Sequence, residues 1–239
     1  HTELMLRAFG HGVGRNPVIS LTGGGALSGC DIEVPGDISS AAFFLVGACI
    51  GSNSGVTIRG VGVNPTRDGV LRILEAMGAC IRVYNRRTAG GEAVADIDAS
   101  SSKLCGINIP SEWISLAIDE FPVLMVAAAA ADGLTTVSGV GELRVKESDR
   151  IAAIAEGLGR LGIRCETNTN TMTVHGGELS SGTVRSFGDH RIAMAFAVAA
   201  VAARGPVLIE DCVNVATSFP GFASLARRCG MELEEQRSL

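Results

Sequence analysis

A run of charged residues near the middle of the chain could bind an anion. It reads Glu-Leu-Arg-Val-Lys-Glu-Ser-Asp-Arg over residues 142–150. Lys146 and Arg150 lie four residues apart, so they can share one helical face. Both stand at the start of a helical pattern, where the helix dipole disfavours cations unless an anion docks there. A charge run is more often a solvated face, but Arg191 repeats this placement, and together the three cations favour an anion site.

Carboxylates close to these cations could move protons. Glu147 belongs to the charged run, and Asp119 precedes an apolar run that contains a proline. Asp37, Asp119 and Asp189 each stand before an apolar run, where aspartate ordinarily caps a helix. We expect capping for Asp37 and Asp189, whereas for Asp119 capping and a catalytic role both stay open. The sequence contains no P-loop, no dinucleotide-binding glycine motif after a strand and no nucleophile-elbow serine motif.

Three apolar runs of small residues must position these groups. Each follows an aspartate and is followed by a glycine and a β-branched segment. The runs cover residues 41–50, 123–131 and 192–203. A helix that is apolar on all sides is buried on all sides. We therefore predict buried helices at about residues 38–50, 120–131 and 190–203.

An outer helix and strands follow each apolar run. Amphipathic spacing that ends in glycine predicts helices within residues 66–77, 147–161 and 219–229. Strands are expected at residues 80–83, 163–166 and 231–234, with second strands near 95–98 and 171–174. We predict an α/β (α+β) fold of three β-α-β-α-β-β pseudo-repeats around buried parallel helices. The repeats would span about 31–105, 106–178 and 179–239, and residues 1–30 fit only the end of a preceding unit.

The composition excludes several classes of protein. With 46% hydrophobic residues the chain can fill a core, which excludes intrinsic disorder. The 20 Lys and Arg against 25 Asp and Glu give a net charge of −5, which argues against a nucleic-acid partner. The apolar runs fall far short of the roughly 20 residues that span a membrane. With no secretory pattern at its start, the chain is expected in the cytoplasm, away from membranes.

The cysteines and the N-terminus add two expectations. The seven cysteines are scattered without a metal-binding spacing, so we expect no metal site. The chain opens on His1 inside an amphipathic pattern and not on a methionine. We therefore expect it to be a fragment of a longer protein.

Five stretches of the chain resemble the 5-enolpyruvylshikimate-3-phosphate (EPSP) synthase family, in the family's order. They are residues 35–41, 118–122, 144–150, 188–194 and 216–220. The family fold has two similar domains of three β-α-β-α-β-β units each. The resemblance implies that residues 31–239 form the C-terminal domain and that residues 1–30 end the N-terminal domain.

The same resemblance implies a reaction of the shikimate pathway. The enolpyruvyl group of phosphoenolpyruvate is transferred to the 5-hydroxyl of shikimate 3-phosphate, and phosphate is released. The reaction passes through a tetrahedral intermediate and needs no metal or organic cofactor. The family is also the target of glyphosate, which makes that compound a further expected ligand.

The resemblance assigns roles to five residues. Asp119 resembles the carboxylate that contacts the shikimate hydroxyls and accepts a proton, and Glu147 resembles the acid that protonates the methylene carbon. Lys146 resembles the lysine that lies beside both substrates. Arg150 and Arg191 resemble the arginines that hold phosphoenolpyruvate. The expected catalytic residues are thus Asp119, Lys146 and Glu147, and the expected substrate-binding residues are Asp119, Lys146, Arg150 and Arg191.

The chain also departs from the family pattern. Thr217 stands where many relatives have a lysine that contacts the same anion, and Glu142 stands where some have asparagine. The N-terminal groups that bind most of the shikimate 3-phosphate, and the loop that largely sets glyphosate sensitivity, have no counterpart. We therefore expect the chain to need a missing N-terminal domain as its partner and to be inactive alone.

Two alternatives are kept at this stage. The chain could be a half that binds or complements another polypeptide without catalysing anything itself. It could also be a UDP-N-acetylglucosamine enolpyruvyl transferase, which shares the fold and the chemistry but lacks the stretch at residues 144–150.

Overall fold

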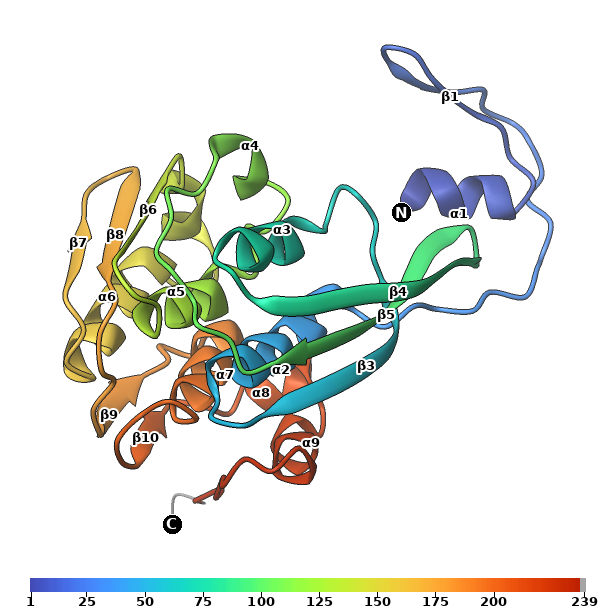
Figure 1. Cartoon of the computed structure of the whole chain (residues 1–239). Helices are drawn as coiled ribbons and strands as arrows, with labels where there is room; N and C mark the ends of the chain where they lie inside the picture. The colour runs from blue at the N-terminus through green and yellow to red at the C-terminus, as the bar shows by residue number, and fades with distance from the viewer. Residues whose placement is uncertain (237–239) are drawn as a thin grey trace.

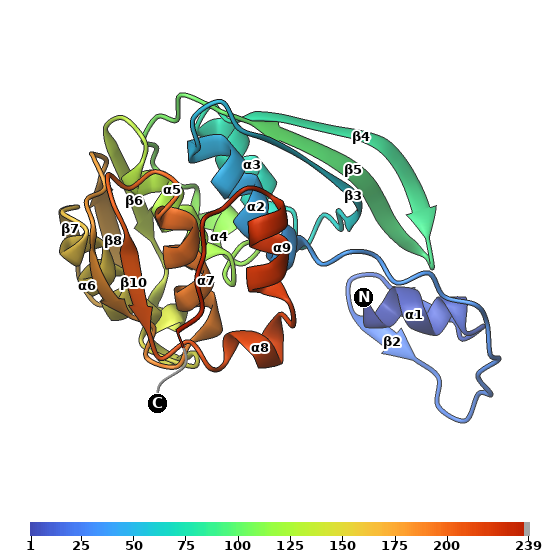
Figure 2. The same ribbon diagram turned by 90° about the horizontal axis from the view of Figure 1, so that it is seen from below.

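Three apolar helices lie at the centre of the molecule. In the computed structural model, which describes residues 1–236, they are α2 (Ile38–Ile50), α5 (Phe121–Ala129) and α7 (His190–Ala199). The three contact one another, and every residue of α5 is buried. Figures 1 and 2 show them enclosed by sheets and outer helices. The predicted buried helices are confirmed, and α5 and α7 end two and four residues earlier than expected.

Small sheets surround these helices. The strands β3 (Gly55–Gly62), β5 (Glu92–Ser100) and β4 (Cys80–Ala89) form one antiparallel sheet in that order. The strands β6 (Leu134–Ser138), β8 (Thr171–His175) and β7 (Cys165–Thr167) form a second antiparallel sheet. The strands β9 (Gly182–Arg185) and β10 (Val207–Glu210) pair in parallel, with α7 between them in the chain. The fold is therefore mixed α/β.

Outer helices complete the fold. The amphipathic ones are α3 (Gly69–Ala76), α6 (Arg150–Arg160) and α9 (Phe222–Arg228). Short helical turns are α4 (Ser111–Ile114), the 3-10 helix η1 (Gly141–Val145) and α8 (Val215–Ser218). The helix α9 packs on α2 through aromatic side chains: Phe222 meets Phe43 at a ring-centroid distance of 6.1 Å and Phe44 at 5.9 Å.

The structure corrects two expectations about these outer elements. The strand predicted at 231–234 is absent: residues 231–236 have no regular structure, and the Leu233 carbonyl accepts a hydrogen bond from the Arg227 side chain at 2.7 Å. A strand needs a neighbouring strand to satisfy its backbone groups. Lys146 and Arg150 do not share a helical face either. Lys146 is extended and ends η1, and Asp149 caps α6 by accepting the Ala152 N–H at 3.0 Å.

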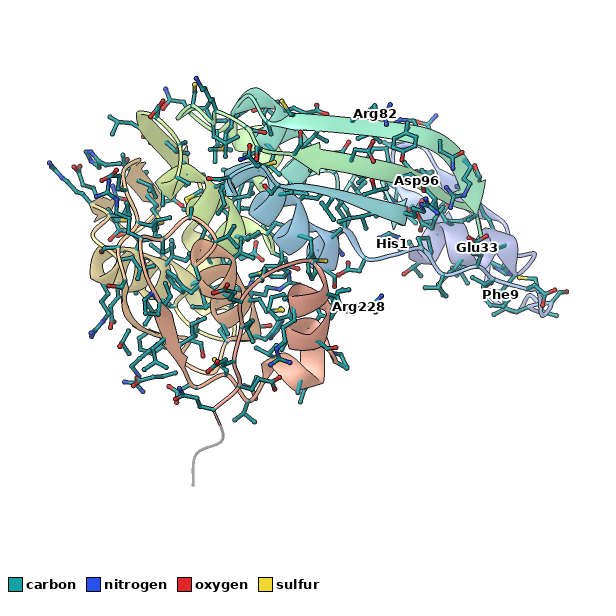
Figure 3. The ribbon with its side chains drawn as sticks, turned by 60° about the horizontal axis from the view of Figure 1, so that its bottom comes forward. His1, Phe9, Glu33, Arg82, Asp96 and Arg228 are labelled. Carbon is teal, nitrogen blue, oxygen red and sulfur yellow. The ribbon has the colours of Figure 1, made fainter. Side chains whose placement is uncertain are left out.

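The N-terminal segment extends away from this body. It contains α1 (Thr2–Ala8) and a hairpin of β1 (Val13–Arg15) and β2 (Ile19–Leu21), and none of its helical residues is buried. His1 bonds Glu92 on the β4–β5 hairpin at 2.5 Å. Figure 3 shows His1 and Glu33 beside the far end of that hairpin, with Phe9 further out. Segment 1–30 thus touches the rest of the chain mainly at the hairpin tip.

Close packing between α6 and α7 gives a stability prediction. A Cβ on Gly157 would lie 2.1 Å from Cζ of Phe196, whose ring is buried, whereas a Cβ on Gly159 in the same helix would meet nothing within 4 Å. Gly157→Ala should lower the free energy of unfolding by about 1–3 kcal/mol through overpacking. Gly159→Ala should raise it by about 0.5–1 kcal/mol, because alanine is the better helix residue. Urea unfolding of both variants checks this, and equal effects would contradict the packing described.

Candidate active site

The carboxylate of Asp119 lies among three cations. Lys146 Nζ is 3.7 Å and Arg150 Nη1 3.5 Å from Asp119 Oδ1, and Arg191 Nη2 is 3.6 Å from Oδ2. Glu147 joins through Arg150, whose Nη2 is 2.5 Å from Glu147 Oε2. The structure thus brings together all five residues expected from the sequence. They span 72 positions in the chain, so only the fold can assemble them.

Helix starts position this group. Asp119 lies two residues before α5, Arg150 is the first residue of α6, and Arg191 is the second residue of α7. Each of these helices directs free N–H groups and the positive end of its dipole toward its start. The cluster therefore lies where several helix dipoles favour an added negative charge.

The three aspartates divide into two kinds. Asp37 accepts the Ser40 N–H and Asp189 accepts the Arg191 N–H, both at 2.9 Å, so capping is confirmed for these two. Asp119 is not a cap, because Glu120 occupies the cap position of α5. The Asp119 carboxylate is about a third exposed and faces the cations, which leaves it free for chemistry.

Arg150 is the most deeply buried of the cations. Its side chain is 1% exposed, and its Nε donates to the fully buried Asp189 at 2.8 Å. Burial alone would raise the pKa of Asp189, but the Arg150 guanidinium, the Arg191 N–H and the Ser148 hydroxyl together hold it below its usual value. Arg150 Nη1 is buried without a hydrogen bond of its own and lies nearest to Asp119. Nη1 of Arg150 is therefore a donor without a hydrogen-bond acceptor, next to Asp119.

Lys146 is held from two sides. Its ammonium lies 2.9 Å from Glu142 and 3.7 Å from Asp119. The hydrogen bond that Lys146 donates to Glu142 raises the pKa of Lys146, as do the charges of Asp119 and Glu142, whereas burial and the Arg150 charge lower it. Lys146 is therefore a cation at neutral pH, suited to bind anions and not to accept a proton.

Three further residues belong to the cluster and were not expected from the sequence. They are Ser39, Arg67 and Glu120. The Ser39 hydroxyl donates to Glu120, and Arg67 and Arg191 lie 3.7 and 3.9 Å from the same Glu120 oxygen. The one available signal was that Glu120 lies beside Asp119 and precedes a run without other charges.

Within residues 1–236, Thr217 makes no side-chain hydrogen bond to the cluster. Its hydroxyl donates to the Asn214 carbonyl at 2.8 Å within α8. Asn214 in turn donates to the Gly188 carbonyl at 2.5 Å and so ties α8 to the start of α7. Thr217 therefore lies near the site without supplying the positive charge that a lysine would.

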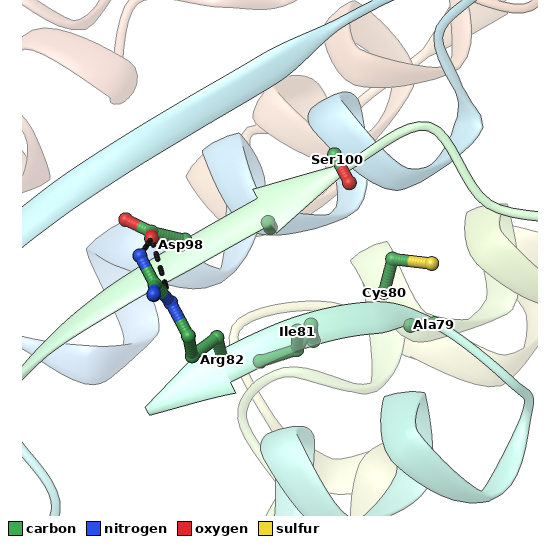
Figure 4. Close-up of a pocket in the computed structure, with 7 residues that line it drawn as sticks. Ala79, Cys80, Ile81, Arg82, Asp98 and Ser100 are labelled. Atoms are coloured by element: carbon green, nitrogen blue, oxygen red, sulfur yellow. Dashed lines mark hydrogen bonds and ion pairs between the residues drawn. The ribbon is translucent and has the colours of Figure 1, made fainter. Parts of the chain in front are cut away.

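Two hollows in the surface lie away from the cluster. One of about 410 Å³ lies over the outer face of β4 and β5, where Arg82 pairs with Asp98 at 2.5 Å (Figure 4). Another, of about 260 Å³, lies between α2, β3 and α9. Neither includes Asp119 or its three cations. In residues 1–236 no three His, Cys, Asp or Glu side chains are grouped to hold a metal ion, and none of the helices there has the length and hydropathy to cross a membrane.

Known proteins match both the sequence and the fold. The family model described as EPSP synthase (3-phosphoshikimate 1-carboxyvinyltransferase) matches residues 1–225. The 3-phosphoshikimate 1-carboxyvinyltransferase of Nitrosococcus oceani is 52% identical over 234 residues, covering 98% of this chain and 53% of the relative. That of Alkalilimnicola ehrlichii is 55% identical over 237 residues and is likewise covered to 53%. The chain therefore spans about half the length of the curated relatives it matches.

Solved structures point to the same family as the sequence matches. An EPSP synthase from Acinetobacter baumannii superposes with a TM-score of 0.93 at 49% identity, over 97% of this chain and 54% of that one. The enolpyruvyl transferase NikO from Streptomyces tendae superposes with a TM-score of 0.73 at 20% identity, which shows a shared fold alone. By sequence and by structure, this chain belongs to the EPSP synthase family.

Proposed function

We propose that the chain supplies one wall of an EPSP synthase active site. The assembled enzyme would transfer the enolpyruvyl group of phosphoenolpyruvate to the 5-hydroxyl of shikimate 3-phosphate and release phosphate. The observation that carries this proposal is the Asp119 carboxylate with three cations 3.5–3.7 Å away. Both substrates are anions and the attacking hydroxyl must lose a proton, so a base among cations suits the reaction.

The domain organisation is part of the proposal. Residues 31–239 would be the C-terminal domain, built of three related repeats at about 31–105, 106–178 and 179–239, of which the third lacks the strand expected at 231–234. Residues 1–30 would end the N-terminal domain. The order of helices and strands around α2, α5 and α7 supports this division, as does the loose attachment of the N-terminal segment. The partner of the chain is then the rest of that N-terminal domain.

Each residue of the cluster has a proposed step. Glu147 gives a proton to the methylene carbon of phosphoenolpyruvate, which makes the neighbouring carbon electrophilic. Asp119 accepts the proton of the 5-hydroxyl as its oxygen attacks that carbon, and a tetrahedral intermediate forms. Glu147 then takes a proton back from the new methyl group as the bond to phosphate breaks, which restores the double bond, and the proton on Asp119 passes to solvent. Lys146, Arg150 and Arg191 balance the negative charge of the substrates throughout.

The contacts of Glu147 and Arg150 support this assignment. The Glu147 side chain is about half exposed, so it can reach a substrate above the cluster. Arg150 Nη1, which has no hydrogen bond of its own, would donate one to a phosphate or carboxylate oxygen. A bound anion would also compete with Glu147 for Arg150 and so release the acid beside the carbon it protonates. Glyphosate, as another anion, would meet the same cations.

The first test is whether the chain needs its missing half. By itself it should release no phosphate from the two substrates, because holding two anions in contact needs both walls. Joining the chain to the N-terminal half of the Nitrosococcus oceani relative gives what we call the assembled enzyme, and this should be active. The measurement is phosphate release, with the complete relative assayed in parallel.

Two outcomes would contradict the proposal. Turnover by the chain alone that Asp119→Ala abolishes would mean that it builds a complete site by another route. An inactive assembled enzyme, with the complete relative active and the assembled enzyme folded, would favour a half that binds without catalysing.

A further inference from the structure

Glu120 is a buried carboxylate without an ordinary structural reason for its position. It is 3% exposed and occupies the cap position of α5, yet its side chain makes no capping bond. Cap positions favour short side chains that reach back to their own helix. The Glu120 side chain instead reaches toward α2 and α7. A buried charge is costly unless it is paired, so its partners show what it does.

One oxygen of Glu120 connects three other elements. Its Oε1 accepts a hydrogen bond from Ser39 Oγ on α2, and Arg67 Nη2, from the loop before α3, donates to the same hydroxyl at 2.7 Å. Arg67 Nη2 is also 3.7 Å from Oε1, and Arg191 Nη1 on α7 is 3.9 Å from it. A single carboxylate oxygen therefore lies between two guanidinium groups.

Arg191 is fixed by the same short stretch of chain. Its Nη1 donates to the Asp119 carbonyl at 3.1 Å, and its Nη2 is 3.6 Å from Asp119 Oδ2. Asp119 thus holds the Arg191 guanidinium by its carbonyl and its carboxylate, and Glu120 holds it by its charge. We propose that Glu120 is a positioning residue that keeps Arg191 over Asp119 by offsetting its repulsion from Arg67. The inference rests on the proposed function, in which Arg191 binds phosphoenolpyruvate.

The charges around Glu120 explain why its negative charge matters. The groups that face it are Arg67 and Arg191, the Ser39 hydroxyl, and Asp119 on its own segment. Burial raises the pKa of Glu120, Asp119 raises it further, and Ser39 and the two arginines oppose this. Without the Glu120 charge, the two guanidinium groups would face each other in a poorly solvated place, where like charges repel strongly. Arg67 is about a third exposed and could move outward, whereas Arg191 would lose its alignment with Asp119.

A purely structural role for Glu120 makes a different prediction. If the carboxylate only joined α2, α5 and α7, its loss would lower stability and affect both substrates alike. A positioning role acts through Arg191, so it affects the substrate that Arg191 binds. A rise of KM for phosphoenolpyruvate alone, with little change in kcat, would indicate a positioning role. Equal changes for both substrates would indicate a structural role.

The test uses Glu120→Gln in the assembled enzyme. Glutamine keeps the shape and one oxygen that can accept from Ser39, replaces the other oxygen by an amide NH2, and so removes the charge. We expect KM for phosphoenolpyruvate to rise about tenfold, KM for shikimate 3-phosphate to stay within about twofold, and kcat within about threefold. Adding Arg67→Gln should bring KM for phosphoenolpyruvate back toward the original value, because the repelling charge is then gone.

A matched control is Glu92→Gln. Glu92 is also buried, at 8% exposure, and accepts from Asn64 at 3.0 Å on the outer sheet, away from the cluster. The Glu92→Gln substitution should leave both KM values unchanged. Should Glu120→Gln fail to fold, Glu120→Asp keeps the charge but withdraws it by one methylene, and it should raise KM for phosphoenolpyruvate at least about threefold.

The outcomes separate this inference from the proposed function. An inactive assembled enzyme without any substitution would contradict the proposed function itself. An active assembled enzyme whose Glu120 variants leave KM for phosphoenolpyruvate unchanged would overturn the positioning role. So would an equal rise of both KM values together with a loss of stability, or a failure of Arg67→Gln to reverse the effect.

Discussion

Asp119→Asn in the assembled enzyme is expected to lower kcat by about two to four orders of magnitude, the usual contribution of a general base. The substitution keeps the shape of the side chain and removes its capacity to accept a proton. It also removes the negative charge that lies 3.5–3.7 Å from Lys146, Arg150 and Arg191. The three cations would then face an incoming anion without that competing charge. KM for phosphoenolpyruvate should therefore not rise.

The control for this variant is the aspartate at the start of a neighbouring central helix. Asp37 accepts the Ser40 N–H at 2.9 Å as the cap of α2, and asparagine caps a helix about as well as aspartate. Asp37→Asn should leave kcat within about twofold. The measurement is the steady-state rate with both substrates varied. A kcat for Asp119→Asn within about threefold of the original would place the base elsewhere, with Glu147 as the next candidate to replace.

The central helices could be predicted because each run is apolar along its whole length. A helix without a polar face must be buried wherever it lies, so α2, α5 and α7 follow from composition alone. Arg150 and Arg191 could be predicted to lie at one anion-binding cluster because each stands at the start of a helix, against its dipole. Both arguments are local, and neither needs to know which segments meet.

Other features depend on contacts that sequence spacing does not reveal. Arg150 belongs to a run that ordinarily would be solvated, and its burial depends on Asp189, 39 residues away. Glu120 meets Ser39 across 81 residues. The strand expected at 231–234 had the right residue types but no neighbouring strand with which to pair in the described chain. In each case the missing information was the identity of the partner.

The buried pair of Arg150 and Asp189 also limits how the site can be tested. Their side chains are 1% and 0% exposed and lie 2.8 Å apart. Replacing Arg150 would leave the Asp189 carboxylate buried without its cation, so a loss of activity would mix binding with stability. Arg191 is 18% exposed, and its substitution is the cleaner probe of phosphoenolpyruvate binding.

Asp189→Asn is expected to lower the free energy of unfolding of the chain by about 3–5 kcal/mol, the usual cost of breaking a buried pair from one side. Asparagine can still cap α7, so the loss comes from the Arg150 charge, which stays in a buried site. The matched control is Asp211→Asn. That aspartate pairs with Arg185 at 3.2 Å on the surface and has a positive φ of 63°, which asparagine also adopts. Loss of this surface ion pair should lower the free energy of unfolding by less than about 1 kcal/mol.

The same pair predicts how stability depends on pH. The folded-state pKa of Asp189 lies below its ordinary value, so folding favours the charged form. The stability that this group contributes is therefore fully present above the unfolded-state pKa of about 3.9, and it is lost as the pH falls through the lower folded-state value. Asp189→Asn should remove that part of the acid transition, so that the difference between the original chain and the variant shrinks below about pH 4. Urea unfolding at pH 7 and at steps between pH 5 and pH 2 measures both effects. A difference that stays constant over that range would mean that the Asp189 charge does not stabilise the fold, even though its carboxylate lies against Arg150.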